Sequence, residues 1–286
     1  MPRSSGFRLR SADASDLPRI ADLRESVGWG VHHWALEAVL ERPHARTIVA
    51  VDPREKVIGV GSGIVYGALG FVGNMVVDAA HRRRGIGEAI LQAVISFLEE
   101  RGVVRIELYA TSEGRPLYER SGFTSAGPSV VARLPRRSEW PAAHGPIREA
   151  ASEDAAKLAA YDAPRFGGDR GPLLRRMLAD PERPVLVAHG RDGIAGYGWL
   201  RPDGERLGPL VADTPDVAID LLAAAFERIP SAELLSLNLP SANRAGAERL
   251  AAMGAELEPW DGRMARGAPV SRRDETIYGN LVGALG

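Results

Sequence analysis

Residues 77–87 read Val-Asp-Ala-Ala-His-Arg-Arg-Arg-Gly-Ile-Gly. This stretch leads from a β-rich run, Phe71–Val77, into a segment whose apolar residues keep helical spacing from Gly87 to Glu100. Backbone N–H groups at the start of a helix are unpaired and carry the positive end of the helix dipole, so they bind phosphate oxygens. The stretch therefore predicts a strand, a phosphate-binding loop and a helix in direct succession.

The composition of this loop suits a bulky phosphate group. Gly85 and Gly87 let the main chain approach a pyrophosphate without an intervening Cβ, and Arg82, Arg83 and Arg84 can add charge-assisted contacts. A dinucleotide fingerprint would need a third glycine and a place after the first strand, and a nucleoside-triphosphate loop would need Gly-Lys-Ser/Thr. Neither requirement is met. The alternative to a phosphate site is a solvated basic turn before a helix.

In this context the loop resembles the acyl-CoA loop of the GNAT superfamily of N-acetyltransferases, through Arg82-x-x-Gly85-x-Gly87 after Val77. The predicted order of elements over residues 7–134 agrees with that family. The resemblance implies a mixed sheet that opens beside its fourth strand, with pantetheine in the gap and acetyl-CoA as the cofactor. It also implies that backbone N–H groups near Val77 polarise the thioester oxygen. The cofactor-binding residues that it implies are Met75, Val76, Val77, Arg82, Arg83, Arg84, Gly85, Ile86, Gly87 and Glu88.

Residues 117–123 read Leu-Tyr-Glu-Arg-Ser-Gly-Phe and resemble the family's Leu-Tyr-x-x-x-Gly-Phe signature. The resemblance makes Tyr118 the catalytic acid that protonates the leaving thiolate. A phenol of pKa about 10 is a suitable donor to a thiolate of pKa about 8.5. The alternative is that Tyr118 only packs a short helix on the sheet. Thr111 departs from the family, in which Asn is common at this position, and this leaves a cofactor or capping contact in doubt.

The sequence does not identify a single residue as the base that takes the proton from the acceptor amine. Asn74 and Asp78 lie at the end of the fourth predicted strand, and His32 and His33 lie on the second predicted helix. A chain of water molecules is an equal alternative.

Residues that could line the acceptor pocket lie between the first two predicted helices and in the corresponding place of the second half, after a helix predicted at 152–161. The alternatives are core tryptophans and a loop of ion pairs and caps. The substrate-binding candidates are Trp29, His32, Trp34, Asp78, Asp162, Arg165, Phe166 and Asp169.

The predicted elements occur twice, in the order β-α-α-β-β-β-α-β-α-β, over halves of about 140 residues. The halves end on strands predicted at 123–134 and 255–266, and Pro and Gly mark a connection after the first. We expect a catalytic domain at 1–135, a linker at 136–145 and a second domain at 146–286. The predicted fold class is α/β (α+β), with two tandem GNAT-like domains, each a mixed, mostly antiparallel sheet flanked by helices.

The second half lacks the features of the cofactor site. Leu250 stands at the position of Tyr118 and cannot donate a proton, and Asn243 stands at the position of Thr111. The segment 214–217, which corresponds to the phosphate loop, has neither glycine nor arginine, and its Asp216 would compete with an anion for the helix N-terminus. We therefore expect one acyl-CoA per chain, bound in the first half, with the second half as scaffold and acceptor wall.

Composition excludes several classes of function. A hydrophobic content of 45% with 26% charged residues is typical of a globular protein, and a net charge of −1 gives no general attraction to nucleic acid or membranes. The absence of cysteine removes disulfides, thiolate catalysis and Cys-ligated metal, and we expect no metal site. Without an apolar leader or membrane span we expect a cytoplasmic protein.

We expect direct transfer of an acetyl group to a primary amine of a small molecule, because the chain has neither a cysteine nor a Gly-x-Ser-x-Gly motif for a covalent intermediate. The alternatives are a non-catalytic acyl-CoA sensor or interaction module and a protein lysine acetyltransferase. The acceptor could be an amino acid, an amino sugar, a polyamine or an antibiotic amine. We expect no nucleic-acid or membrane partner, and a homodimer stays open.

Overall fold

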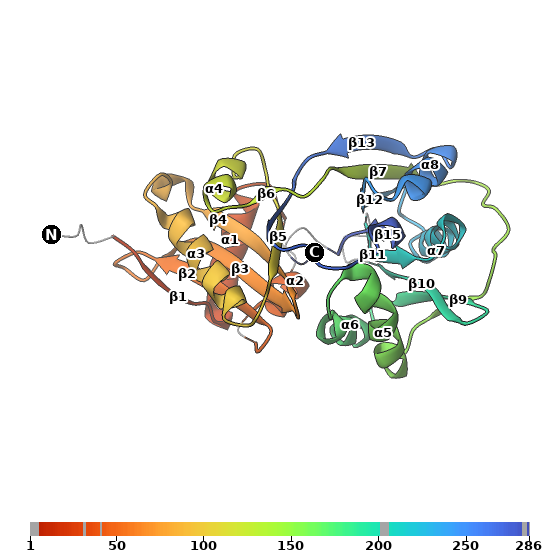
Figure 1. The fold of residues 1–286 in the computed structure, drawn as a ribbon, viewed down its shortest axis with the longest axis horizontal. Helices are drawn as coiled ribbons and strands as arrows, with labels where there is room; N and C mark the ends of the chain where they lie inside the picture. The colour runs from red at the N-terminus through yellow and green to blue at the C-terminus, as the bar shows by residue number, and fades with distance from the viewer. Residues whose placement is uncertain (1–5, 31–32, 41, 201–205, 282–284, 286) are drawn as a thin grey trace. The chain divides into compact units, whose positions relative to one another are not determined.

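The computed structural model describes residues 6–30, 33–40, 42–200, 206–281 and 285, and the chain forms two compact units (Figure 1). Unit 1 comprises Met1–Thr124, Met264–Pro269 and Gly283–Gly286. Unit 2 comprises Ser125–Arg263 and Val270–Val282. No helix in the described residues is long and apolar enough to cross a membrane.

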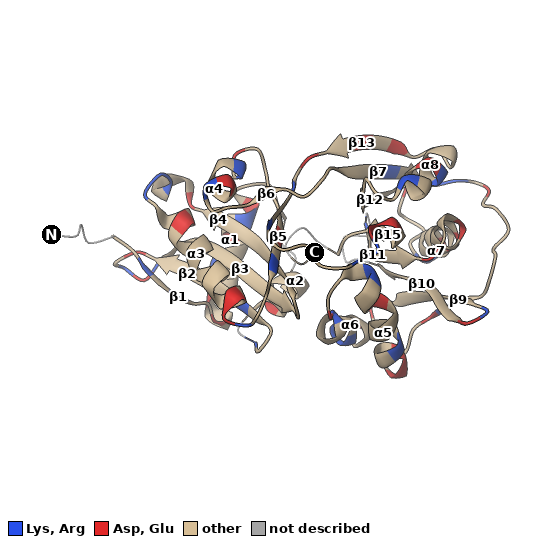
Figure 2. Ribbon diagram, in the orientation of Figure 1, with Lys and Arg blue, Asp and Glu red and all other residues tan. Residues whose placement is uncertain are grey.

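Unit 1 is built on a seven-stranded sheet. Its strands, in spatial order, are β1 (Arg8–Ser11), β2 (Ala45–Val51), β3 (Val57–Tyr66), β4 (Leu69–Val77), β5 (Arg105–Tyr109), β14 (Arg263–Gly267) and β6 (Thr124–Ser125). Pairing is antiparallel from β1 to β4 and parallel between β4 and β5. Strands β3 and β4 carry no charged residue (Figure 2), because both of their faces are covered.

Helices cover both faces of this sheet. They are α1 (Leu17–Glu25), α2 (His33–Ala38), α3 (Ile86–Glu99) and α4 (Arg115–Arg120). Helix α3 packs Ile90 and Val94 on the face of β3 that carries Gly61 and Gly63. A Cβ at either glycine would fall within 3.0 Å of these side chains, so the glycines allow the helix to lie close to the sheet. Helix α1 packs on the opposite face with Ile20 and Leu23.

The sheet of unit 1 opens beside β4, as the family resemblance implies. Strands β4 and β5 pair only at Leu69–Phe71, although β4 continues to Val77. A β-bulge interrupts the pairing of β3 with β4, because Ser62 pairs with Gly73 but Val60 pairs with Val76. The bulge contains Asn74 in the left-handed region, at φ 54°, a conformation that Asn tolerates better than most residues.

Unit 2 contains two sheets. The larger has the order β15 (Ile277–Gly279), β11 (Leu207–Ala212), β10 (Gly193–Leu200), β9 (Val185–Gly190) and β8 (Ile147–Glu149). The smaller has the order β12 (Leu234–Pro240), β7 (Ser129–Pro135) and β13 (Glu256–Trp260). The helices are α5 (Ala155–Phe166), α6 (Gly171–Leu178), α7 (Pro215–Arg228) and α8 (Arg244–Ala252).

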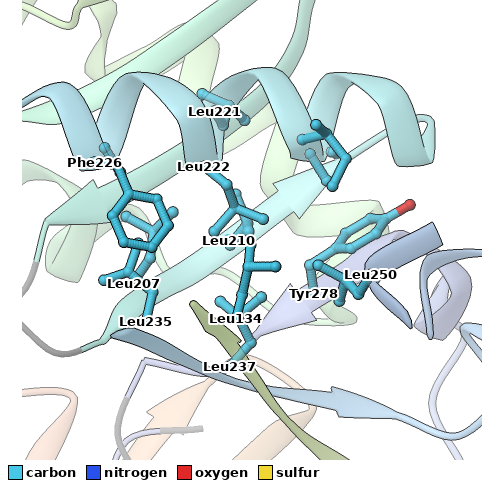
Figure 3. Packing of buried hydrophobic residues seen from close by; sticks show 14 of the residues in the cluster. Leu134, Leu207, Leu210, Leu221, Leu222, Phe226, Leu235, Leu237, Leu250 and Tyr278 are labelled. Carbon is cyan, nitrogen blue, oxygen red and sulfur yellow. The ribbon is translucent and has the colours of Figure 1, made fainter. Parts of the chain in front are cut away.

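The core of unit 2 joins these layers. Figure 3 shows Leu222 and Phe226 of α7 above Leu210 of β11, together with Leu134 of β7 and Leu237 of β12. A side chain from the first half of the chain therefore lies inside the core of unit 2. The predicted α/β (α+β) class with mostly antiparallel sheets and flanking helices is confirmed.

The predicted domain boundary at 135 differs from the observed division. Gly127 and Pro128 break the strand predicted at 123–134 into β6 and β7, and β7 belongs to unit 2, where it pairs with β12 and β13. The strand predicted at 255–266 is likewise divided into β13 and β14, and most of β14 belongs to unit 1. Each unit therefore includes a strand from the other half of the sequence.

Two further predictions need correction. The segment 136–145 is not a linker between the units, because it belongs to unit 2, where Trp140 packs on the core and His144 N donates to Asp220 at 2.8 Å. The helix predicted to end at 161 continues to Phe166, since Gly167, at φ 87°, provides the C-terminal cap.

Candidate active site

Unit 1 contains a pocket of about 600 Å³ where the end of β4, the start of α3 and the turn before α4 meet. Most of the predicted cofactor residues line it together with one predicted acceptor residue, Trp29. These lining residues are Trp29, Met75, Val76, Val77, Arg82, Arg83, Gly85, Ile86, Gly87 and Glu88. The rest of the wall consists of Val27, His81, Thr111, Ser112, Glu113, Gly114, Leu117 and Arg120. Among them, Thr111 is the position at which the family resemblance raised a cofactor or capping contact. The predicted residue Arg84 is not among the lining residues.

At the end of the pocket formed by residues 82–88, no side chain of the described residues caps the start of α3. Gly85 is the N-cap of α3, at φ 78°, and has no side chain to bond the first-turn amides of Ile86, Gly87 and Glu88. The corresponding helix of unit 2, α7, differs because the side chain of Thr214 accepts a hydrogen bond from Val217 N at 3.3 Å. The start of α3 thus keeps the donors that a phosphate needs, whereas the start of α7 uses one internally.

Gly87 lies in the pocket wall between Val77 and Leu117. A Cβ placed there would lie 3.5 Å from Leu117 Cδ2 and 3.6 Å from Val77 Cγ2, which are ordinary van der Waals contacts. A small side chain therefore fits without displacing the walls, but it takes space from the pocket between β4 and α4.

Arg82 connects the two sides of the pocket. Its Nε donates to Val77 O at 3.2 Å, and its Nη1 donates to Glu113 Oε1 at 2.8 Å. Both side chains line the pocket, and that of Glu113 is 75% exposed. Glu113 therefore competes with any phosphate for the charge of Arg82.

We expect Glu113→Gln to bind acetyl-CoA about two- to fivefold more tightly at low salt, since an exposed ion pair contributes only modestly. The gain should shrink as ionic strength rises. Calorimetric titration at two salt concentrations measures it, and Glu119→Gln is the matched control, because Glu119 is exposed on α4 and does not line the pocket. Weaker binding in Glu113→Gln would show that the carboxylate helps to hold the loop.

A buried polar chain supports the bulge of β4. The Arg24 guanidinium donates to Asn74 Oδ1, and Asn74 Nδ2 donates to Ser62 Oγ at 3.1 Å. Arg24 also donates to the carbonyls of Trp29 and Gly30, at 3.2 Å each, and burial lowers its pKa. The sequence analysis missed Arg24. The signal that could have indicated it is the presence of a charged residue on the apolar face of α1. The amide of Asn74 is hydrogen-bonded at both its oxygen and its nitrogen, and a neutral amide is too weakly basic to take a proton from an amine.

Asp78 caps the loop. It accepts hydrogen bonds from Ala80 N at 3.0 Å and from Arg19 Nη2 at 2.5 Å, and its carboxylate lies 3.5 Å from His81 Nδ1. Burial raises the pKa of Asp78, but the bonds from Ala80, His81 and Arg19 outweigh it and lower the pKa overall. Asp78 does not line the pocket, so this geometry favours the capping role over that of a base or acceptor contact.

The aromatic and histidine residues predicted on the acceptor side differ in whether they line the pocket. Trp29 lines the pocket, whereas Trp34 is half-buried on α2 and does not. His33 is exposed at the start of α2, and His32 lies outside the described residues.

Tyr118 lies on α4 behind the pocket wall formed by Gly114 and Leu117. Its side chain is buried, its ring packs edge-on against Phe123 at 6.0 Å, and a Cβ at Gly114 would lie 3.1 Å from it. Among the described residues its hydroxyl has no hydrogen-bond partner, and burial raises its pKa to about 12. Tyr118 is therefore a protonated phenol whose ring lies next to Gly114, a residue of the pocket wall.

The acceptor candidates of the second half lie in unit 2 and are engaged there. Asp162 is fully buried and accepts hydrogen bonds from Arg170 Nε at 2.9 Å and from Tyr197 OH at 2.7 Å. Arg165 donates to Asp213 at 2.9 Å. The remaining two are also occupied: Arg170 covers the ring of Phe166, and Asp169 caps Gly171 N at 2.7 Å. These contacts match the alternative of ion pairs and caps, and contact with an acceptor stays a prediction.

Comparisons with known proteins agree with the site and the fold. Two family models, each described as an acetyltransferase (GNAT) domain, match residues 43–125 and 158–279. The uncharacterized N-acetyltransferase YitH of Bacillus subtilis is 31% identical over 66% of this chain and 67% of its own length. A mycothiol acetyltransferase of Clavibacter sepedonicus is 28% identical over 51% of this chain and 54% of its own.

A solved structure extends the likeness to the whole chain. The crystal structure of a Pyrococcus horikoshii protein assigned as an acetyltransferase has a TM-score of 0.79 and 24% identity, and the match covers 98% of this chain and 96% of that protein. At this level of identity the likeness concerns the fold, and it includes both tandem halves.

Proposed function

The chain belongs to the GNAT family of acetyltransferases, and we propose that unit 1 transfers an acetyl group from acetyl-CoA to the primary amine of a small molecule. One observation carries the proposal. The uncapped start of α3, the end of β4 and the turn before α4 border a single pocket, and the ring of Tyr118 lies next to Gly114 of its wall.

The residues present fit an acyl-CoA. Gly85 leaves the first-turn N–H groups of α3 without a capping side chain, and Gly87 leaves the wall open to a pyrophosphate. Arg82 and Arg83 line the same end and add positive charge. When bound, acetyl-CoA supplies the activated acetyl group as a thioester.

The remaining roles fall to the backbone and to Tyr118. The chain at Met75–Val77 lines the pocket where β4 no longer pairs with β5, so its N–H groups are the proposed donors to the thioester oxygen. Tyr118 holds the proton for the departing sulfur. Orientation of the amine against the thioester supplies most of the remaining rate. Among the described residues of unit 1 no side chain stands out as the base, and we propose that water takes the proton from the acceptor amine.

We propose the class of the acceptor from the name of a relative. The Clavibacter relative is named for the small molecule mycothiol, and we propose a small-molecule amine for this chain too. A panel of amino acids, amino sugars, polyamines, antibiotic amines and a lysine-containing peptide tests this through thiol release from acetyl-CoA. We expect turnover with one of the small amines. Turnover with the peptide alone would favour a protein lysine acetyltransferase, and tight acetyl-CoA binding without turnover on any amine would favour a sensor.

We expect acetyl-CoA to saturate at one equivalent per chain. In unit 2 the helix α7 is capped by Thr214, its first turn carries Asp216, and Leu250 replaces the tyrosine. Calorimetric titration of the full chain gives the stoichiometry. A second equivalent that persists when the site of unit 1 is blocked would contradict the assignment of unit 2.

A further inference from the structure

The strand β15 occupies a special position in unit 2. By sequence order and spacing, β11 and β12 of unit 2 correspond to β4 and β5 of unit 1, between which the sheet opens. Arg206, the residue before β11, forms an isolated parallel bridge with Ser236 of β12. Beyond it, β15 pairs with β11, with Leu210 opposite Gly279, and Asn280 N donates to Asn238 O of β12 at 3.2 Å. In unit 1 the gap between the corresponding strands borders the pocket. In unit 2 the backbone of residues 277–280 bridges the equivalent gap.

Asn243 fixes this segment from the side of α8. Its Nδ2 donates to Ile277 O at 2.9 Å, and its Oδ1 accepts from Gly246 N at 2.9 Å. In unit 1 the corresponding residue, Thr111, lines the pocket. One structural position thus faces the pocket in unit 1 and holds a peptide carbonyl in unit 2.

Side-chain packing completes the contact. Tyr278 is buried in the same cluster as Leu210 and Leu250, the residue at the position of Tyr118 (Figure 3). A Cβ at Gly246 would lie 2.6 Å from Tyr278 Cε1, and a Cβ at Gly279 would lie 2.6 Å from Leu207 O. Glycines on both the walls and the segment allow this close approach. The space is shaped for an extended peptide.

We propose that unit 2 has converted the slot of an acyl-CoA site into a peptide-binding slot, and that residues 277–280 of the same chain are its occupant. The mode is strand addition, in which main-chain hydrogen bonds supply affinity and a pocket for one side chain, here that of Tyr278, supplies specificity. The segment takes over the place between two diverging strands, so unit 2 keeps its fold without a cofactor. The proposal rests on the family assignment and not on catalysis by unit 1.

Hydrogen exchange of the full wild-type chain is the first test. The Asn280 amide, bonded to Asn238 O, should exchange at least about 100-fold more slowly than an unstructured amide, as an ordered β-strand does. Saturating acetyl-CoA should slow exchange in unit 1 at residues 85–88 and leave 277–280 unchanged. Rapid exchange at 277–280, or a change there on adding acetyl-CoA in a Gly87→Asp background, would overturn the proposal.

Substitution on the segment itself is the second test. Gly279→Val should release the segment, because the added side chain meets Leu207 O, and exchange at 277–280 should rise at least about 100-fold. Ser271→Val is the matched control, because Ser271 is exposed and lies before the segment 277–280 in the same part of the chain, and this variant should exchange like the wild type. Protection of 277–280 in Gly279→Val that equals the control would overturn the proposal.

Binding of an added peptide is the third test, and it distinguishes a peptide-binding slot from a covered cofactor site. A synthetic peptide of residues 270–281 should bind Gly279→Val at least tenfold more tightly than it binds the wild type, whose slot is filled. The same peptide carrying G279V should not bind either protein. Binding of acetyl-CoA to the double variant Gly87→Asp, Gly279→Val would instead reveal a hidden cofactor site. Failure of the wild-type peptide to bind a folded Gly279→Val chain would likewise overturn the proposal. If Gly279→Val does not fold, the exchange measurement on the wild type still decides.

Discussion

Gly87→Asp should abolish acetyl-CoA binding while unit 1 stays folded. A Cβ at Gly87 makes only ordinary contacts, 3.5 Å to Leu117 and 3.6 Å to Val77, so the wall tolerates the added atom. The carboxylate, however, would stand at the first turn of α3, where the phosphates are proposed to bind. A like charge placed against a bound phosphate costs several kcal/mol, which corresponds to ~10²- to 10³-fold in affinity.

Calorimetry and thermal unfolding check this expectation together. Gly87→Ala is the matched control, because it adds the Cβ without the charge, and we expect it to lose far less affinity than Gly87→Asp. An unfolding midpoint close to the wild type would show that the fold survives. Unchanged affinity in a folded Gly87→Asp chain would mean that the loop at 82–87 does not hold the cofactor.

The succession of strand, loop and helix at 77–100 could be predicted from the sequence because its causes are local. A glycine N-cap, a second glycine two residues later and a helical pattern are all visible within 77–100, and the structure places this stretch at one end of a pocket. The strand predicted at Phe71–Val77 and the helix predicted at Gly87–Glu100 agree with β4 and α3 to within two residues for the same reason.

The exchange of strands between the halves could not be read in this way. The segments around β7 and β14 alternate like any strand, and nothing in the alternation names the partner strand. The choice of partner is decided by tertiary packing, such as the burial of Leu134 in the core of unit 2. The breaks at Gly127-Pro128 and Asp261-Gly262 were visible, but a break alone does not show that the chain moves to another unit.

Burial explains the remaining differences at the site. A sequence shows that Asp162 and Arg170 are charged, but it does not show that they pair inside unit 2 instead of facing a substrate. The same holds for Arg24, which reaches Asn74 across two elements that are far apart in sequence. The sequence did not indicate Ser112, Glu113 and Gly114 as part of the wall, because their role comes from the direction in which the turn before α4 faces, and packing on the sheet sets that direction.

Tyr118→Phe should leave acetyl-CoA affinity unchanged and lower turnover by about 10²-fold, as expected for the loss of general-acid catalysis. The substitution keeps the ring that packs against Phe123 and removes a hydroxyl without a partner among the described residues, so stability should change little. Tyr66→Phe is the control. Its buried hydroxyl donates to Leu285 O, so its loss should lower stability and spare turnover. Wild-type turnover in Tyr118→Phe would return Tyr118 to a packing role.

The pH profile gives this prediction a second readout. Burial raises the pKa of Tyr118 to about 12, and a group with a raised pKa keeps its proton until the pH approaches that value. The acid form is therefore complete through pH 7–10, and kcat should show no basic limb from this residue below about pH 11, whereas a phenol of ordinary pKa would lose half of its acid form near pH 10. Measured from pH 7 to 10.5 with a saturating acceptor, kcat of the wild type should stay level on the basic side. A fall in kcat of about fourfold over pH 9–10.5, the fall that a group of pKa about 10 produces, would show that the phenol titrates near its ordinary pKa if it disappears in Tyr118→Phe.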